Sequence, residues 1–424
     1  MNKPYHTSME NVIDILEQRG FIDALTSEEI RTFVKTPQAL YVGFDPTGDS
    51  LHLGHLIPIL SLAWFAKCGH RPIALVGGAT AMIGDPSGKS QERNLLDQEQ
   101  IEKNKIGIKE NLKSILQQDI PLVDNFDWFK KMHFIDFLRD IGKYFRIGQM
   151  LSKDSVKLRM QSEEGMSFTE FSYQVLQGYD FLHLFQSEGV CLQMGGSDQW
   201  GNIVAGIELI RKVHGKPSFG ITFPLLTRSD GKKFGKTEEG TIWLSAHKTS
   251  PYQFYQYLFN TLDNDVLTLM KRLTFMPLSE IQLWEESMKS SDYKQHSAQK
   301  ALAEAVTLLV HGKEGLQSAL FLTEQLVPGG RTSLDKATLQ ALVQEGVYTN
   351  VENLVGMKIV DLLVQAGLQS SKSDARRLIQ NGGISLNNEK MTDESAVVTE
   401  SDLKEGEFLL LSIGKKQKRL IRKK

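Results

Sequence analysis

Two histidines that flank a leucine and a glycine, His52-Leu53-Gly54-His55, suggest phosphate chemistry. They follow an apolar run at residues 40–44 and begin a helical segment, so both side chains lie on one face beside the positive end of the helix dipole. Gly54 removes a side chain where a nucleobase or ribose could approach the backbone. The histidines could instead only cap and pack the first turn. A zinc site fits less well, because metal-binding histidines on a helix are usually four residues apart.

A glycine-rich segment, Gly84-Asp85-Pro86-Ser87-Gly88-Lys89-Ser90, superficially resembles a phosphate-binding P-loop. A P-loop requires a glycine five residues before Gly88, and Ile83 stands there, so the sequence excludes a P-loop nucleotidase. Asp85 remains of interest as a carboxylate after a predicted strand, where open α/β sheets bind ligands. The alternative is a turn capped by aspartate.

A third segment, Asp230-Gly231-Lys232-Lys233-Phe234-Gly235-Lys236-Thr237, is a basic loop that follows an apolar run. Lys233 and Lys236 are three apart around a glycine and could grip a triphosphate when the loop closes. Taken alone, such a loop is more often a solvated basic turn. Its significance depends on the other two segments.

The elements that must position these residues form a βαβ pattern. A strand at residues 40–44 ends in the turn Asp45-Pro46-Thr47-Gly48, a helix covers residues 51–68, and a second strand covers residues 72–78. A strand at 190–194 and a helix at 202–213 repeat the alternation. We therefore expect an α/β fold with a Rossmann-like, doubly wound parallel sheet.

The rest of the chain divides into further modules. Ser250-Pro251 is a good helix start, and Pro328-Gly329-Gly330 marks a break. The predicted domains are a catalytic domain at 1–247 with a helical insertion at about 95–160, an α-helical domain at 248–325, a linker at 326–356 and a small α+β domain at 357–424.

Composition limits the protein's class. The chain has 424 residues, 41% of them apolar, with 49 basic and 51 acidic residues, so a polyanionic partner must be met by local patches. Cys68 and Cys191 show no metal-type spacing and are expected to be buried thiols in a reducing cytosol. No signal peptide or membrane-spanning run is evident, and we expect a cytoplasmic protein without a membrane partner.

Together the three segments resemble the class I aminoacyl-tRNA synthetases. The His-Ile-Gly-His element of that family corresponds to His52-Leu53-Gly54-His55, and its Lys-Met-Ser-Lys-Ser loop to Lys233-Phe234-Gly235-Lys236-Thr237. This chain departs at Leu53, Phe234, Gly235 and Thr237. Both histidines, both lysines and Gly54 are retained, so the phosphate chemistry is little affected.

Longer stretches are similar to the tyrosyl-tRNA synthetases within that class. These stretches are residues 41–55, Ser172-Tyr173-Gln174-Val175-Leu176-Gln177-Gly178-Tyr179-Asp180 and Gly195-Gly196-Ser197-Asp198-Gln199-Trp200. The resemblance extends to the C-terminal unit, which is similar to the S4-like RNA-binding module. It implies an enzyme that activates L-tyrosine with ATP and then transfers it to the 3′-terminal ribose of tRNA.

The resemblance also implies roles for individual residues. Tyr41 and Asp180 hydrogen-bond the phenol hydroxyl, which phenylalanine lacks. The ammonium is assigned to Asp85, Tyr173 and Gln177; the less favoured alternative is that Tyr173 and Gln177 form an ordinary i,i+4 helix pair. Gln199 lies on the carboxylate side, and Asp198 takes the ribose hydroxyls. The residues implied in catalysis are Thr47, His52, His55, Lys233 and Lys236, and those implied in ATP binding are Gly43, Asp45, Gly54, Asp198, Lys233, Phe234, Gly235, Lys236 and Thr237.

The same resemblance implies partners. Mg²⁺ is expected with ATP, and no tightly bound metal held by the protein is expected. The tRNA contacts are assigned to Lys372, Arg376 and Arg377, with the basic tail at 415–424 adding charge, although such a tail is more often only a solvated end. A homodimer through residues 125–160 is expected, and Phe126, Trp128, Phe129 and Phe134 are compatible with it.

Three alternatives stand beside this interpretation. A nucleotidylyltransferase with a His-x-Gly-His motif normally lacks the lysine loop and the RNA module. A tryptophanyl synthetase shares the fold, but the pair Tyr41 and Asp180 argues against it because indole has no hydroxyl. A non-catalytic RNA-binding relative would have no need of His52 and Lys236.

Overall fold

A computed structural model describes residues 11–87, 95–116, 120–163, 165–237, 240–327, 329–414 and 417–424, without the side chains of residues 154 and 155. Gly88, Lys89 and Ser90 of the glycine-rich segment, Pro328 and the tail residues Lys415 and Lys416 lie outside the described residues. The chain forms two compact units: unit 1 comprises residues 1–248 and 261–302, and unit 2 comprises residues 249–260 and 303–424.

Unit 1 is built on a six-stranded sheet with the order β1-β6-β5-β2-β3-β4. Every neighbouring pair is parallel except β1 and β6. The central strands are apolar on both faces, as expected for a sheet covered by helices on both sides. The predicted doubly wound parallel sheet is therefore confirmed. Its strands are β1 (Ala24–Leu25), β2 (Ala39–Phe44), β3 (Arg71–Val76), β4 (Leu122–Asp124), β5 (Val190–Gly196) and β6 (Phe219–Phe223).

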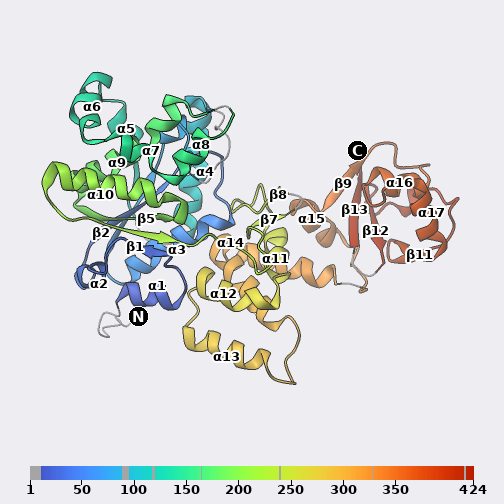
Figure 1. Cartoon of the computed structure of the whole chain (residues 1–424). Coiled ribbons are helices and arrows are strands. Elements are labelled where there is room, and N and C mark those ends of the chain that lie inside the picture. The colour runs from blue at the N-terminus through green and yellow to red at the C-terminus, as the bar shows by residue number, and fades with distance from the viewer. Residues whose placement is uncertain are drawn as a thin grey trace. The chain divides into compact units, whose positions relative to one another are not determined.

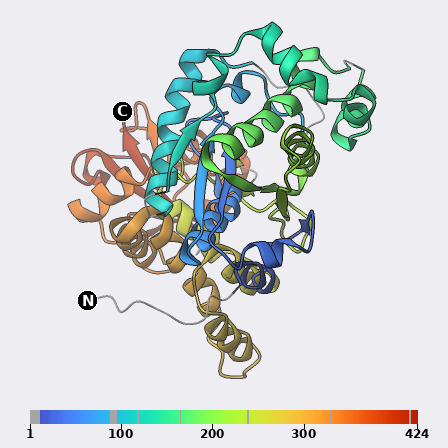
Figure 2. The ribbon, with the colours of Figure 1, turned by 90° about the vertical axis from the view of Figure 1, so that its left-hand side faces the viewer.

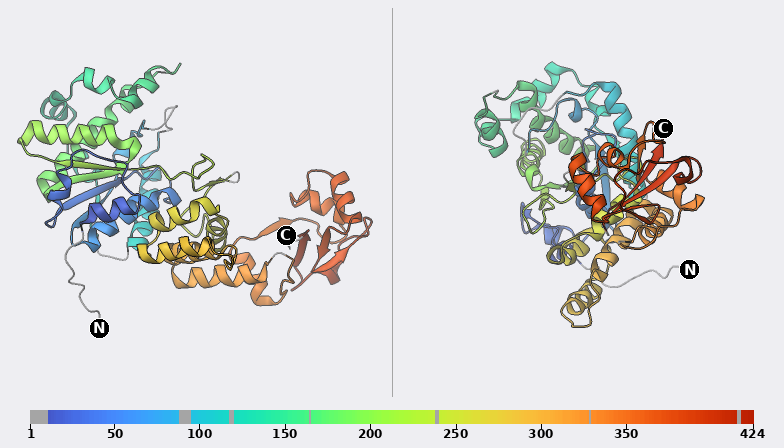
Figure 3. Two further views of the ribbon diagram at one scale, coloured as in Figure 1. Left: turned by 60° about the horizontal axis from the view of Figure 1, so that its bottom comes forward. Right: turned by 90° about the vertical axis from the view of Figure 1, so that its right-hand side faces the viewer.

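Helices cover both faces of this sheet. α3 (Leu56–Lys67) connects β2 to β3, and α9 (Phe168–Glu188) and α10 (Trp200–His214) lie on the other side (Figures 1 and 3). Ser167 caps α9, and Gly189 ends it in the left-handed conformation. These helices bring residues far apart in sequence to the carboxyl ends of β2 and β5.

A long insertion separates β3 from β5. The sequence predicted only helices here, but residues 122–124 form β4, which pairs with β3 because the extended apolar segment extends the edge of the sheet. The helices after β4 gather at one side of unit 1 (Figure 2). The insertion holds η2 (Thr80–Met82), α4 (Gln98–Leu116), α5 (Phe126–Phe129), α6 (Phe134–Asp140), η3 (Gly142–Tyr144), α7 (Ile147–Leu151) and α8 (Asp154–Met160).

The remaining elements of unit 1 lie before β2, in the connections between strands of the main sheet, and after β6. The described residues include no helix that is both long and apolar enough to span a bilayer. The remaining elements of unit 1 are α1 (Val12–Gln18), α2 (Ile30–Phe33), η1 (Leu53–His55), η4 (Ser197–Gln199), β7 (Lys236–Thr237), β8 (Gly240–Thr241), α12 (Asp263–Leu273) and α13 (Leu278–Met288).

Unit 2 combines helices with a second sheet. Ser250 caps α11 (Pro251–Phe259) as predicted, and α14 (Ser297–Gln325), which begins in unit 1, is kinked at Gly312. A five-stranded sheet of order β11-β10-β12-β13-β9 packs on α16 and α17 (Figure 3). Residues 326–356, expected as a linker, contain α15 and β9. The elements are α15 (Lys336–Gln344), β9 (Tyr348–Val351), α16 (Ile359–Gln365), α17 (Lys372–Gln380), β10 (Ile384–Leu386), β11 (Glu389–Met391), η5 (Glu400–Asp402), β12 (Phe408–Ile413) and β13 (Gln417–Lys423).

Candidate active site

A cavity of about 430 Å³ opens at the carboxyl ends of β2 and β5, inside unit 1. This is where open α/β sheets bind ligands. All predicted catalytic and tyrosine-binding residues line it, and so do the predicted ATP-binding residues except Thr237. The predicted residues that line it are Tyr41, Gly43, Asp45, Thr47, His52, Gly54, His55, Asp85, Tyr173, Gln177, Asp180, Asp198, Gln199, Lys233, Phe234, Gly235 and Lys236.

The two histidines form the turn that leads into α3. The backbone N–H of Gly54 donates to Nδ1 of His52 at 3.1 Å, and the backbone N–H of His52 donates to Nδ1 of His55 at 3.1 Å. The ring centroids are 3.9 Å apart. Burial and the neighbouring His52 lower the pKa of His55 well below its usual value, so His55 is neutral at pH 7. The motif thus caps its turn and lines the cavity at the same time.

The lysine loop is connected to this histidine turn through the backbone. Ile242 donates its N–H to the carbonyl of Gly235 at 2.9 Å, and Leu53 donates its N–H to the carbonyl of Ile242 at 2.9 Å. Gly235 has a φ of +87°, and a Cβ added there would lie 3.1 Å from Cβ of Leu53. Lys233 and Lys236 therefore line the cavity on a loop that rests against the histidine motif.

Tyr41 and Asp180 lie at a deeply buried end of the cavity, 1% and 2% exposed. Asp180 accepts hydrogen bonds from Nδ2 of Asn125 at 3.0 Å and from Nε1 of Trp128 at 2.9 Å. The hydroxyl of Tyr41 is buried without a hydrogen-bond partner among the described residues. Burial raises the pKa of Asp180 and that of Tyr41 well above their usual values. The two side chains reach one cavity from a strand and a helix without bonding to each other.

A hydrogen-bond network connects the buried end of the cavity to Asp45 and Tyr173, which also line it. Asn125 also donates to Oγ1 of Thr80 at 3.0 Å, and Thr80 donates to Oδ1 of Asp45 at 2.7 Å. The hydroxyl of Tyr173 donates to Oδ2 of Asp45 at 2.7 Å. A Cβ at Gly77 would lie 1.9 Å from Oδ1 of Asp45, so only glycine leaves room for this carboxylate.

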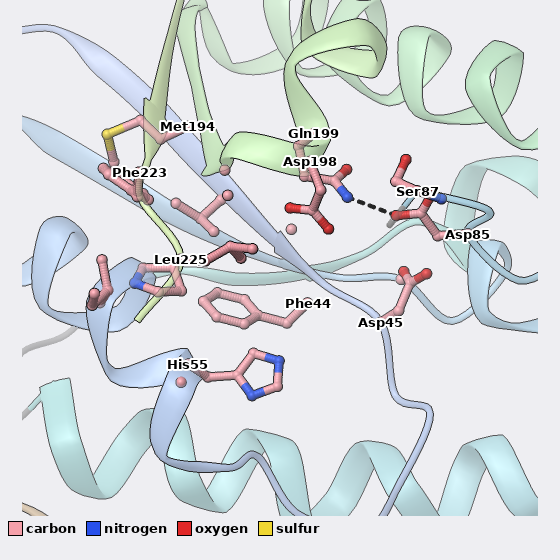
Figure 4. Close-up of a pocket in the computed structure, with 18 of the residues that line it drawn as sticks. Phe44, Asp45, His55, Asp85, Ser87, Met194, Asp198, Gln199, Phe223 and Leu225 are labelled. Atoms are coloured by element: carbon pink, nitrogen blue, oxygen red, sulfur yellow. Dashed lines mark hydrogen bonds between the residues drawn. The ribbon is translucent and has the colours of Figure 1, made fainter. Parts of the chain in front are cut away.

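A second polar group surrounds Asp85, which lies near Asp45 (Figure 4). Nε2 of Gln199 donates to Asp85 at 2.7 Å, and Nδ2 of Asn202 donates to Oε1 of Gln177 at 3.0 Å. Asp198 points into the cavity beside them, and burial raises its pKa. The cavity therefore has carboxylates on one side and the cationic loop and imidazoles on another.

Several residues of the site were missed by the sequence analysis. Thr80, Asn125 and Asn202 belong to the networks around the cavity, and Trp128, which the sequence analysis considered only as compatible with a dimer surface, donates to Asp180. Gln193 lines the cavity from the middle of β5. A glutamine inside an otherwise apolar buried strand was the one available indication in the sequence.

The predicted RNA-binding residues lie on α17 in unit 2 and belong to no cavity wall described above. Lys372 forms an ion pair with Asp361 at 2.7 Å, and Arg377 forms one with Asp374 at 2.7 Å. Both basic side chains are largely exposed, so these ion pairs contribute little to stability.

Comparison with known proteins agrees with this geometry. Residues 34–327 match the family described as tRNA synthetases class I (W and Y), and residues 339–421 match the tyrosine–tRNA ligase SYY-like C-terminal domain.

Individual relatives extend the similarity over nearly the whole chain. The tyrosine–tRNA ligase of Protochlamydia amoebophila is 55% identical over 98% of this chain and 99% of its own. The chloroplastic/mitochondrial tyrosine–tRNA ligase of Arabidopsis thaliana is 48% identical over 97% of this chain and 83% of its own. A crystal structure of a C-terminally truncated mitochondrial tyrosyl-tRNA synthetase from Aspergillus nidulans covers 75% of this chain and 94% of its own, with a TM-score of 0.67 and 32% identity. The chain therefore belongs to the tyrosine–tRNA ligases of the class I tRNA synthetase family.

Proposed function

We propose that this chain activates L-tyrosine with ATP to form tyrosyl-adenylate and pyrophosphate, and then transfers tyrosine to the 3′-terminal ribose of its tRNA. The observation that carries the proposal is that the histidine turn, the lysine loop, Tyr41 and Asp180 all line one cavity. Phosphate-binding groups beside a phenol-binding end fit an enzyme that joins ATP to tyrosine.

Tyrosine occupies the end of the cavity near Tyr41 and Asp180. Its phenol hydroxyl satisfies buried polar groups that phenylalanine would leave unpaired, which is the physical basis of the selectivity. The ammonium is taken by Asp85, Tyr173 and Gln177, and Gln199 lies on the carboxylate side. Support comes from the bond between Gln199 and Asp85, which keeps these two side chains together.

ATP binds over the histidine turn. Gly43, Asp45 and Gly54 contact the nucleotide, and Asp198 takes the ribose hydroxyls. The phosphates face Thr47, His52 and His55, while Lys233 and Lys236 hold the leaving pyrophosphate from the loop. Phe234, Gly235 and Thr237 give the loop its shape. Mg²⁺ enters with ATP as part of that substrate and shares the charge of its phosphates.

Both steps use nucleophiles that the substrates supply. In the first step a carboxylate oxygen of tyrosine attacks the α-phosphorus, and the bond to the pyrophosphate oxygen breaks. In the second, a ribose hydroxyl attacks the tyrosyl carbonyl, and AMP leaves. The protein contributes positioning and stabilisation of the charge that grows on the phosphates, which preorganised donors and cations do well in a cavity with little water.

Isotope exchange between pyrophosphate and ATP tests this proposal. Exchange should require tyrosine and should be far weaker with phenylalanine or tryptophan. Equal exchange with tryptophan would favour a tryptophanyl enzyme, and no exchange with any amino acid would favour a non-catalytic RNA-binding protein.

The proposed assembly is a cytoplasmic homodimer. Support comes from large apolar side chains exposed on α6: Phe134 is 64%, Ile135 69% and Leu138 42% exposed. Contiguous exposed apolar residues mark interaction surfaces.

A further inference from the structure

Gln193 occupies an unusual position in the sheet. It is the register partner of Tyr41 on β2 and of Gly220 on β6, and Tyr41 is in turn the partner of Ile73 on β3. Register partners in a parallel sheet project their side chains from the same face. Tyr41 packs on Phe181 of α9, with ring centroids 5.6 Å apart, so Gln193 stands beside Tyr41 on the face that α9 covers.

The carboxamide oxygen of Gln193 is buried without a hydrogen-bond donor among the described residues. The residue is 2% exposed. The hydroxyl of Tyr41 is in the same condition. A buried carbonyl oxygen that has given up water without gaining a donor destabilises the free protein, so such groups are rare unless a ligand satisfies them. Both atoms belong to residues that line the proposed tyrosine site.

The phenol hydroxyl of tyrosine needs an acceptor for its proton at this end of the cavity. Asp180 already accepts two hydrogen bonds, one on each carboxylate oxygen. Burial raises its pKa well above the usual value, while these two hydrogen bonds lower it. Both oxygens of Asp180 therefore have a donor already, whereas Oε1 of Gln193 has none among the described residues. The Tyr41 hydroxyl can donate a hydrogen bond to the phenol oxygen of the substrate. An amide oxygen, in contrast, can only accept.

We propose that Gln193 is a specificity-determining residue whose Oε1 accepts the hydrogen bond of the substrate phenol hydroxyl beside Tyr41. This role rests on the proposed function. With tyrosine bound, the phenol oxygen accepts a hydrogen bond from Tyr41 and the phenol hydroxyl donates to Gln193, so both unpaired buried atoms are satisfied together. Phenylalanine satisfies neither of them.

The test compares the full-length protein with Gln193→Met, which keeps the length of the side chain and removes the acceptor. kcat/KM is measured by pyrophosphate exchange with tyrosine and with phenylalanine. We expect the ratio of the two to fall by about tenfold, because tyrosine loses one hydrogen bond and phenylalanine loses none. Thermal unfolding checks the fold. If Gln193→Met is unfolded, Gln193→Asn, which retracts the amide by one methylene, is expected to lower the ratio in the same direction.

Gln174→Met is the matched control. Gln174 is 4% exposed, its Oε1 is also unpaired, and it lies on α9 outside the cavity wall. Its substitution should leave the ratio unchanged. If kcat/KM in Gln193→Met fell equally for both substrates, or did not fall, the role of Gln193 would be overturned. The proposed function would still be supported by the preference of the unmutated protein for tyrosine. An unmutated protein without that preference would overturn both.

Discussion

Tyr41 and Asp180 illustrate how single residues can be arranged for a ligand rather than for the free protein. Asp180 is held by Asn125 and Trp128, whereas the Tyr41 hydroxyl has no partner in the described structure. An unpaired buried hydroxyl costs about 1–3 kcal/mol. Its retention at the centre of a well-packed sheet is therefore best explained by a bond that forms only with substrate.

Tyr41→Phe should separate stability from selectivity. The free energy of unfolding should stay the same or rise, because the variant loses only an unpaired polar atom. The preference for tyrosine over phenylalanine in pyrophosphate exchange should fall by roughly tenfold, equivalent to about 1.4 kcal/mol. Urea unfolding and exchange kinetics measure the two effects. A clear loss of stability would mean that the hydroxyl has a partner in the free protein.

The sequence predicted the residues whose chemistry follows from local spacing. His52 and His55 are three residues apart on one turn, and Lys236 stands in a short loop motif, so local pattern makes them candidates and the combination of the motifs makes them stronger ones. Asn125 could not be found this way, because it reaches Asp180 across 55 residues through the packing of the insertion on α9. The pairing of Gln193 with Tyr41 likewise depends on strand register, which one sequence does not specify.

At the scale of elements, the two phosphate-binding motifs form one connected structure. Gly235 bonds to Ile242, and Ile242 bonds to Leu53 inside the histidine motif. A Cβ at position 235 would press on Cβ of Leu53 at 3.1 Å, a tight contact that the neighbour must move to accommodate. The position of the lysine loop is therefore set by contact with the histidine turn as well as by its own residues.

Gly235→Ala and Gly231→Ala form a matched pair that tests this connection. Both glycines have positive φ, +87° and +81°, so alanine strains the backbone similarly in each, by about 1 kcal/mol. Only at position 235 does the new Cβ approach Leu53; at 231 it meets nothing within 4 Å. Pyrophosphate exchange should therefore slow about tenfold or more in Gly235→Ala and change little in Gly231→Ala. The affinity for tyrosine should change little in both variants. Similar kinetics in the two variants would rule out the coupling.

The packing of α11 on α14 contains a second testable element. The rings of His311 and Phe254 pack with their centroids 4.8 Å apart. Nε2 of His311 has no hydrogen-bond partner in the described structure, and burial lowers the pKa of His311 to about 4. Between pH 6.5 and about 4 the unfolded chain binds a proton that the folded protein rejects, so stability falls as the pH decreases through this window.

His311→Leu should weaken this pH dependence. Between pH 7 and pH 5 the unmutated protein should lose roughly 1–2 kcal/mol more stability than the variant, because only the unmutated chain carries the imidazole. Urea unfolding followed by circular dichroism at the two pH values measures the difference. Equal losses in both proteins would show that His311 is protonated in the folded state.

At the scale of the whole molecule, the residues proposed for adenylate formation and those proposed for tRNA binding belong to different units. Every residue of the cavity belongs to unit 1, whereas α17 with its basic side chains belongs to unit 2. The formal net charge is only −2, so attraction of a polyanion must arise from such local groups. Adenylate formation and tRNA charging should therefore respond to different substitutions.

The double variant Arg376→Glu, Arg377→Glu should show this separation. Reversing two charges on α17 removes proposed phosphate contacts, so tRNA charging should weaken strongly. The slope of log tRNA affinity against log salt concentration should become shallower by roughly 0.7–0.9 for each lost contact. Tyrosine-dependent pyrophosphate exchange should stay unchanged, because it needs no tRNA. Lys289→Glu is the control: like Arg377, Lys289 is 70% exposed and forms an ion pair within its own helix, here with Glu285 on α13. If Lys289→Glu impaired charging as much, the effect would be one of overall charge, and if the double variant charged tRNA normally, α17 would not contact RNA.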